Sequence, residues 1–178
     1  MKNGFRRTAV AAASVLALGV GAAAWAASAA SAASTSPAAI GRCTAGHLEV
    51  RDRSIPGGGT AGTIYSNLDF TNTGRSTCYL DGYPGVSAIT KGGAQIGQAA
   101  TRNDITPARV IDLRPGATVH ATLGYIGVIV DPSCKEETSA FLKVYPPDST
   151  VANRVPEALT VCRTGQSVLT ITRVRSGA

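Results

Sequence analysis

Apolar and polar residues alternate along several short stretches of this chain with a period of two residues. In residues 119–125, for example, Val119, Ala121, Leu123 and Tyr125 would share one face, with small or polar residues between them. A period of two predicts a half-buried β-strand, whereas a helix would repeat every 3.6 residues. Further strands are predicted at residues 63–71, 86–90, 94–98, 110–113, 141–145, 159–162 and 168–174, and another begins at Cys78.

Turn-forming residues separate these stretches, and no part of the chain beyond residue 42 has a convincing helical period. Gly, Pro, Asn and Asp gather at residues 56–59, 72–74, 81–85, 91–93, 114–116 and 146–148. The Lys-Gly-Gly at 91–93 predicts a tight hairpin, because glycine supplies the positive φ angles that such turns require. Seven to nine short strands spaced in this way are typical of an antiparallel sandwich or barrel, and we favour the sandwich.

The alternation also predicts which residues form the core. Only two phenylalanines, Phe70 and Phe141, lie beyond residue 42, so aliphatic side chains must supply most of the packing. The predicted core consists of Leu48, Val50, Ile64, Leu68, Phe70, Val86, Ile89, Ile111, Leu113, Val119, Leu123, Leu142, Val144, Leu159, Val161, Leu169 and Ile171.

The N-terminal residues have the pattern of an export signal. Lys2, Arg6 and Arg7 precede a small and apolar run from 9 to 27, and Ala-x-Ala sites follow it. This predicts a cleaved secretory signal peptide at residues 1–29, with a cut possible up to 32. An uncleaved membrane anchor and a twin-arginine signal are the weaker alternatives. Residues 30–42, rich in Ala, Ser, Thr and Pro, are predicted to form a flexible leader, and residues 43–175 a single domain.

Loss of the signal would leave a mildly basic protein. Three of the 17 Lys and Arg residues lie within it and all 11 acidic residues lie beyond it, so the secreted chain would carry a net charge of +3. The basic residues are scattered among acidic ones, which argues against nucleic acid as a partner. No second apolar stretch is long enough to span a membrane. We therefore expect a secreted, extracellular protein without a membrane span.

Four cysteines, Cys43, Cys78, Cys134 and Cys162, follow the predicted signal, and export would deliver them to an oxidising compartment. There is no Cys-x-x-Cys pair, so disulfides are favoured over a metal site. Four cysteines allow three connectivities. We prefer Cys43 with Cys78 and Cys134 with Cys162. Cys43 lies at the beginning of the domain and Cys78 begins the strand after the turn at 72–74, while the last two cysteines bracket the strand at 141–145.

The central segment resembles a known family. Asn72-Thr73-Gly74, Thr77-Cys78 and Gly82-Tyr83-Pro84-Gly85-Val86 follow one another as they do in the actinobacterial secreted domain of unknown function 4232. Leu113-Arg114-Pro115-Gly116 and the late cysteines match the same family. The resemblance implies an immunoglobulin-like β-sandwich, exported or lipid-anchored, and it carries no catalytic residues. This chain lacks a cysteine placed for lipid attachment.

No residue pattern indicates catalysis, a metal or a cofactor. The two histidines, His47 and His120, are expected to face solvent. Glu136 and Glu137 are expected on a solvated loop, and together with Asp131 they fall short of a calcium-binding loop. Asn72 and Gly74 suit a turn because both tolerate left-handed backbone conformations. We expect no enzyme, no metal and no cofactor.

Two functions remain open from the sequence. The first is a non-enzymatic module that binds a cell-envelope component or an extracellular protein, because export, disulfides and a sandwich scaffold come without a catalytic set. The second is a secreted inhibitor of extracellular hydrolases, with the segment 131–138 held rigid by Cys134.

Overall fold

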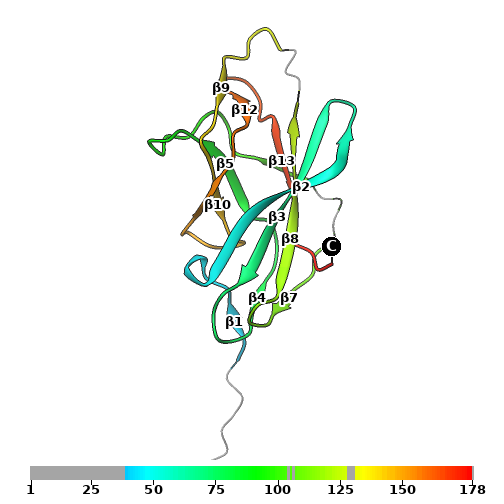
Figure 1. Ribbon diagram of the computed structural model, residues 1–178, viewed down its shortest axis with the longest axis vertical. Coiled ribbons are helices and arrows are strands. Elements are labelled where there is room, and N and C mark those ends of the chain that lie inside the picture. The colour runs from blue at the N-terminus through cyan, green and yellow to red at the C-terminus, as the bar shows by residue number, and fades with distance from the viewer. Residues whose placement is uncertain (1–38, 104, 106, 128–130, 178) are drawn as a thin grey trace, which may run out of the picture. The chain divides into compact units, whose positions relative to one another are not determined.

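Two sheets built from the alternating stretches pack face to face in this computed structural model, which describes residues 39–103, 105, 107–127 and 131–177. The larger sheet has the order β2-β3-β8-β13-β6 and the smaller one the order β11-β10-β5 (Figure 1). The larger sheet comprises β2 (Leu48–Thr60), β3 (Thr63–Asn72), β8 (Thr118–Ile126), β13 (Leu169–Thr172) and β6 (Thr101–Asn103), and the smaller one β11 (Asn153–Pro156), β10 (Phe141–Tyr145) and β5 (Gly85–Ile89).

Two small sheets and one short helix complete the described fold. One small sheet has the order β1-β4-β7, the other pairs β12 with β9, and the helix η1 is a single 3-10 turn. Their bounds are β1 (Gly41–Arg42), β4 (Cys78–Leu80), β7 (Ile111–Leu113), β9 (Glu136–Thr138), β12 (Thr160–Cys162) and η1 (Ala45–His47). The predicted fold class, an all-β sandwich with two disulfides, is confirmed.

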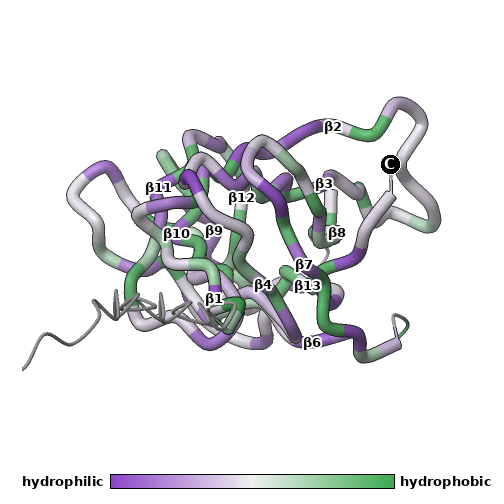
Figure 2. The backbone as a smooth tube through the Cα atoms, turned by 90° about the horizontal axis from the view of Figure 1, so that it is seen from below, coloured by the Kyte–Doolittle hydropathy of each residue, from purple (hydrophilic) through white to green (hydrophobic). Residues whose placement is uncertain are grey.

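The core lies between the two main sheets, where side chains from alternate positions of facing strands meet. Hydrophobic and hydrophilic stretches are interspersed along the backbone (Figure 2). Phe70 on β3, Leu123 on β8 and Leu142 on β10 are each fully buried. All predicted core residues are buried except Ile64, which is 41% exposed. Ile64 lies at the far end of the β2–β3 hairpin, which extends as an arm (Figure 1), so its apolar face is not covered there.

Strand boundaries differ from the prediction where short strands lack an alternating pattern. The described residues contain thirteen strands rather than seven to nine. The strand predicted at 94–98 is reduced to an isolated bridge between Ile89 and Gln95, although the turn at 91–93 forms as predicted. Two pairings are parallel, β1 with β4 and β13 with β6. These short strands are held by their neighbours rather than by their own composition.

The glycine-rich turn predicted at 56–59 is wrong. This stretch continues β2, and the register with β3 shifts between Ser54 and Gly59. The chain reverses instead at Ala61 and Gly62, with φ angles of 48° and 81°. Two central residues with positive φ are what a tight hairpin turn requires. The glycines are therefore accommodated as an irregularity within the strand.

The N-terminal predictions lie largely outside the described residues. The signal peptide at 1–29 and the leader as far as 38 belong to this part of the chain. The last two leader residues, Gly41 and Arg42, form β1 and pair with Cys78 and Tyr79. The ordered fold thus begins slightly before the first cysteine.

Both predicted disulfides form. Cys43 bonds to Cys78 and Cys134 to Cys162, with Cα–Cα distances of 4.9 and 5.0 Å. The first joins the beginning of the fold to β4, and the second joins β12 to the segment before β9. They lie toward opposite ends of the sandwich (Figure 1). Each closes a loop of about 30 residues, which on chain-entropy grounds stabilises a domain by at most about 4 kcal/mol.

Asn72, at the end of β3, connects two turns that are distant in the sequence. Its side chain is buried, with 1% exposure. The amide Nδ2 donates to the carbonyls of Ser76 and Leu113, both at 2.9 Å, and Oδ1 accepts from the Gly74 N–H at 2.9 Å. Its backbone carbonyl also accepts from the N–H of Gly116. Asn72 therefore fixes the 72–78 turn against the 113–116 turn.

The left-handed conformation proposed for Asn72 and Gly74 is not found. Neither has a positive φ angle, and Asn72 is the last residue of an extended strand. A Cβ atom at position 74 would lie 3.0 Å from Asn72 Oδ1 and 3.4 Å from His47 Cβ. Glycine is therefore suited to this position by the close approach of its N–H to the Asn72 amide.

Replacing Asn72 should weaken the whole domain. Asn72→Ala removes one acceptor and two donors from buried backbone groups, so we expect the free energy of unfolding to fall by about 2–4 kcal/mol. Urea denaturation, followed by far-ultraviolet circular dichroism, would measure this change in the free energy of unfolding. Thr73→Ala, at the adjacent exposed residue, is the control and should change it by less than about 0.5 kcal/mol. If the two variants unfold at the same urea concentration, Asn72 does not have the stabilising role described here.

Removing either disulfide should also destabilise the domain. For Cys43→Ser/Cys78→Ser and for Cys134→Ser/Cys162→Ser we expect losses of about 2–4 kcal/mol each, because both bonds close loops of similar length. Urea denaturation without reductant would measure the losses, and reduction of the native protein is the control. If a double variant unfolds at the same urea concentration as the native protein, the disulfide that it lacks does not stabilise the fold.

Candidate functional site

The turn between β4 and β5 places Tyr83 at the edge of the sandwich. Gly82 has a φ of 100°, a conformation that favours glycine, and its carbonyl accepts a hydrogen bond from the Val174 N–H at 3.0 Å. Pro84 is buried on the other side of Tyr83. The turn is thereby held against the segment that follows β13, and the Tyr83 side chain remains half-buried at the surface.

Two arginines from separate segments cover the Tyr83 ring. The guanidinium carbon of Arg173 lies 4.5 Å from the ring centroid, and that of Arg102 lies 5.2 Å from it. Arg102 is on β6, which pairs with β13, and Arg173 directly follows β13. The pairing of β6 with β13 therefore brings the two arginines to the same ring.

These residues line an open groove of about 490 Å³, which we call the Tyr83 groove. It lies between the β4–β5 turn, β6, the end of β10 and the residue after β13. Its charged and aromatic lining residues are Tyr83, Tyr145, Arg102, Arg173, Asp81 and Asp148.

The two groove arginines stack on a ring without forming an ion pair to a carboxylate of the described chain. Arg42, Arg51, Arg53 and Arg163 each form an ion pair with a carboxylate. Within the part of the chain that the structure describes, Arg102 and Arg173 have no such ion pair and no side-chain hydrogen bond. A guanidinium stacked on a ring uses its flat face, so its N–H donors point outward in the plane. Those donors suit a carboxylate or phosphate.

Further stacked cations border the groove. Arg42 pairs with Asp148 of the groove and lies over Tyr79, at 5.2 Å from its centroid. Tyr145 also lines a second groove of about 480 Å³ on the outer side of β10 and β11, where Lys143 lies over the Tyr145 ring at 5.1 Å.

In the second groove Arg154 lies over Phe141, 5.2 Å from its centroid. The described chain has five such contacts, with distances of 4.5–5.2 Å between the cation and the ring centroid. We call this set of stacked residues the cation–aromatic belt: Arg42, Tyr79, Tyr83, Arg102, Phe141, Lys143, Tyr145, Arg154 and Arg173.

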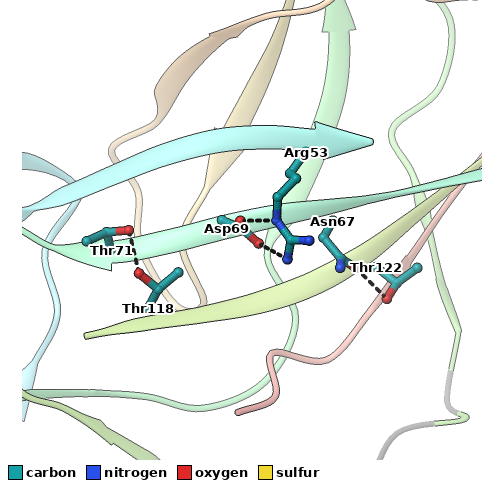
Figure 3. Close-up of polar contacts among 6 residues, drawn as sticks. All are labelled: Arg53, Asn67, Asp69, Thr71, Thr118 and Thr122. Atoms are coloured by element: carbon teal, nitrogen blue, oxygen red, sulfur yellow. Dashed lines mark hydrogen bonds and ion pairs between the residues drawn. The ribbon is translucent and has the colours of Figure 1, made fainter. Parts of the chain in front are cut away.

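The outer face of the larger sheet is polar, but its groups already bind one another. Arg53 makes a two-pronged ion pair with Asp69, at 2.7 and 3.3 Å (Figure 3). Thr122 donates to Asn67 Oδ1 at 3.1 Å, and the hydroxyls of Thr71 and Thr118 lie 2.8 Å apart (Figure 3). These cross-strand pairs hold β2, β3 and β8 in register, so we assign this face a structural role.

His120 does not face solvent as predicted. It is 5% exposed, because the residues after β13 lie along it and pair through the backbones of His120 and Arg175. The Arg175 Nε donates to His120 Nε2 at 2.9 Å. Burial and the positive charge of Arg175 both lower the His120 pKa from its usual 6.5. His47, by contrast, is exposed, as predicted.

The loop predicted around Glu136 and Glu137 is partly wrong. Glu136–Thr138 form β9 and pair with β12, and Glu137 is bound by Arg163 at 3.0 Å. In front of this strand Asp131 accepts from both the N–H and the hydroxyl of Ser133, which lowers its pKa. The segment 131–138 is therefore a loop only as far as Lys135.

A half-buried carboxylate lies at the inner surface of β2. Asp52 is opposite Leu68 and accepts a hydrogen bond from Ser66 Oγ at 2.8 Å. Its pKa is raised from 3.8 to about 6, mainly by burial and also by the negative charges of Glu157 and Asp69. Burial, together with the negative charges of Glu157 and Asp52, raises the pKa of Tyr125. Residue 52 is thus a polar position within an otherwise apolar row.

The described residues offer neither a cluster of metal-ligating side chains nor a membrane-spanning helix. Over the described residues, no three His, Cys, Asp or Glu side chains come together as a metal ion would require. No helix among those same residues is long and apolar enough to cross a membrane.

The chain is thus a small all-β sandwich protein that is cross-linked by two disulfides and has an open polar groove. The sequence profile of one family, described as a domain of unknown function (DUF4232), matches residues 43–175. The chain belongs to that family. No curated protein and no solved structure matches the chain.

The sequence identified only one part of the groove. Tyr83 belongs to the family-like segment at 82–86, whereas no sequence pattern indicates Arg102, Arg173 or Tyr145. Arg102 lies on a three-residue strand that pairs in parallel with β13, and no pattern in the sequence signals that pairing. The family-like motif was the single available signal, because it marks the turn around which the groove forms.

The half-buried carboxylate of Asp52 makes stability depend on pH. Because its pKa is higher in the folded than in the unfolded protein, ionisation of Asp52 destabilises the fold. This destabilisation grows as the pH rises from about 3.8 and is complete above about pH 6. Because Asp52 is partly solvated, we expect Asp52→Asn to raise the free energy of unfolding by about 1–2 kcal/mol at pH 8. The gain should vanish at about pH 3.5.

Urea denaturation at the two pH values would test this. Asp112→Asn, at an exposed residue of β7, is the matched control, since it removes the same charge from the surface. A gain from Asp52→Asn that is equal at both pH values would contradict the effect of burial.

Proposed function

We propose that this chain is a secreted, non-enzymatic binding module that engages its ligand through the Tyr83 groove. The observation that carries the proposal is the pair of arginines, Arg102 and Arg173, stacked on Tyr83 without a carboxylate partner among the described residues. The groove is lined by residues from four separate segments that pair with one another. A site built in this way is organised before the ligand arrives, which lowers the cost of binding.

Secretion is supported by the predicted signal and by the disulfides. Pairing of all four cysteines requires an oxidising compartment, which for most organisms means outside the cytosol. The N-terminal residues 1–29 supply the charged and apolar regions that an export signal needs. We therefore place the working protein outside the cell or in the cell envelope.

Binding without catalysis is supported by the composition of the groove. Neither histidine lines it, and of its two carboxylates Asp148 is engaged by Arg42. Acid–base catalysis needs two groups positioned for proton transfer at one reacting atom. The groove offers instead hydrogen-bond donors, rings and one carboxylate, Asp81, which suit recognition.

The inhibitor of extracellular hydrolases is the second candidate from the sequence. It depended on a long loop held by Cys134, but this loop shortens to residues 131–135 once β9 is counted. No further feature favours it over the binding module. Inhibition of a secreted protease is the result that would favour it.

Retention on material from the producing organism would test the proposal. The secreted chain is incubated with purified cell wall, envelope lipids and culture-supernatant proteins, and bound protein is quantified. We expect retention on one of them, and Tyr83→Leu should reduce it at least about tenfold, because both arginines lose the ring that orients them. Tyr65→Leu is the matched control, since Tyr65 is also half-buried but lies on the outer face of β3.

Two results would count against the binding module. Equal retention of Tyr83→Leu and the native chain would show that the ligand does not use the groove. Stoichiometric inhibition of a secreted protease, unchanged in Tyr83→Leu, would favour the inhibitor instead.

A further inference from the structure

The net charge of the secreted chain is concentrated in one region of its surface. Beyond Arg7 the sequence has 14 basic and 11 acidic residues. The cation–aromatic belt contains five of the basic ones, and Asp81 and Asp148 are the acidic residues that line its two grooves. Nine basic and nine acidic residues remain for the rest of that chain. The positive charge of the protein is thus the charge of the belt.

The belt is extended rather than a single point of charge. The Tyr83 groove and the groove beside β11 each have a volume near 500 Å³ and share Tyr145 as a lining residue. Arg102 and Arg173 lie at one groove, and Lys143 and Arg154 at the other. A small anion would occupy only one pair of these cations. A chain with repeated negative charges can contact both pairs at once, and linked contacts reinforce one another.

The Tyr83 groove also contains side chains, outside the belt itself, that can exchange hydrogen bonds with hydroxyls. Asp81, Asp148 and Ser149 line the Tyr83 groove together with its cations and rings. Carboxylates repel a ligand made only of phosphates, but they accept hydrogen bonds from the hydroxyls of a sugar. The mixture of cations, acceptors and rings therefore matches a polymer that carries both acidic groups and hydroxyls.

Two other polyanionic partners fit the belt less well. Single-stranded nucleic acid binds by stacking its bases on exposed ring faces, whereas the four belt rings are half-buried and each has a cation over it. A membrane surface favours protruding apolar side chains beside the cations. Of the large hydrophobics that are exposed in the described chain, Val151 is the one that lines either groove.

We propose that the ligand of this module is an acidic polysaccharide, bearing carboxylate or phosphate groups, that lies along the cation–aromatic belt from the Tyr83 groove to the groove beside β11. This inference rests on the proposed function, because it names the ligand class of the same site. The acidic groups accept hydrogen bonds from the outward-pointing guanidinium N–H groups, and the sugar hydroxyls donate to Asp81.

Binding to defined polymers would test the ligand class. The secreted chain is titrated with polygalacturonate, with a poly(glycerol phosphate) glycan and with neutral dextran of similar length. We expect binding to one or both acidic polymers and none to dextran. Affinity should fall steeply between about 50 and 200 mM salt, because each contact releases counterions from the polymer. Comparison of the two acidic polymers distinguishes carboxylate from phosphate.

Variants of equal charge would separate the belt from general electrostatics. Arg102→Gln/Arg173→Gln should weaken binding to the acidic polymer at least about tenfold. Arg51→Gln/Lys135→Gln removes the same two charges from exposed residues outside the belt and should change it less than about twofold. Urea denaturation of both variants shows whether each remains folded. Lys143→Gln/Arg154→Gln tests the second groove independently and should also weaken binding.

Several results would overturn the inference. Equal losses in the belt and control variants would show that only net charge matters. Salt-independent binding to dextran would exclude an acidic ligand while leaving the Tyr83 groove as the binding site. Tighter binding to single-stranded DNA or to anionic phospholipid vesicles would assign the belt to another class of polyanion. Loss of the Tyr83→Leu effect on envelope material would instead overturn the proposed function itself.

Discussion

The buried amide of Asn72 is the interaction on which the rest of the sandwich depends. Its three side-chain hydrogen bonds satisfy backbone groups in two turns, one before β4 and one after β7. Those turns bring β4 beside β7, and β4 leads directly into the turn that carries Tyr83. A buried amide can do this because it both donates and accepts, and a satisfied polar group in a core fixes one arrangement of its neighbours. The position of the groove follows from this arrangement.

The Asn72 contacts also give a physical reason for two motifs that are about 40 residues apart. Asn72-Thr73-Gly74 supplies the amide and the close N–H, and Leu113-Arg114-Pro115-Gly116 supplies a carbonyl and an N–H that meet residue 72. The disulfide from Cys43 to Cys78 then joins the beginning of the fold to the same region. One end of the sandwich is thus defined by polar and covalent contacts, whereas its middle is defined by apolar packing.

Sequence reasoning succeeded where the alternation of residues was itself caused by burial. Residues of β8 and β10 alternate because one face of each meets the core, so their strands and their buried residues could be predicted. It failed at Ile64, where an apolar residue continues the pattern on an arm beyond the core. It failed at His120 as well, since a polar residue on the outer face is covered by a segment 55 residues further along the chain. The groove arginines were missed for the same reason, because contacts between distant segments leave no local pattern.

Four of the five belt cations are arginines, and this choice affects when the surface is charged. An arginine does not release its proton under any condition that a folded protein tolerates. A surface built from histidine would be switched by mild acidification. The belt arginines instead remain positively charged when the surrounding medium becomes mildly acidic. Any pH dependence of the groove would then come from its carboxylates, Asp81 and Asp148, rather than from the belt arginines.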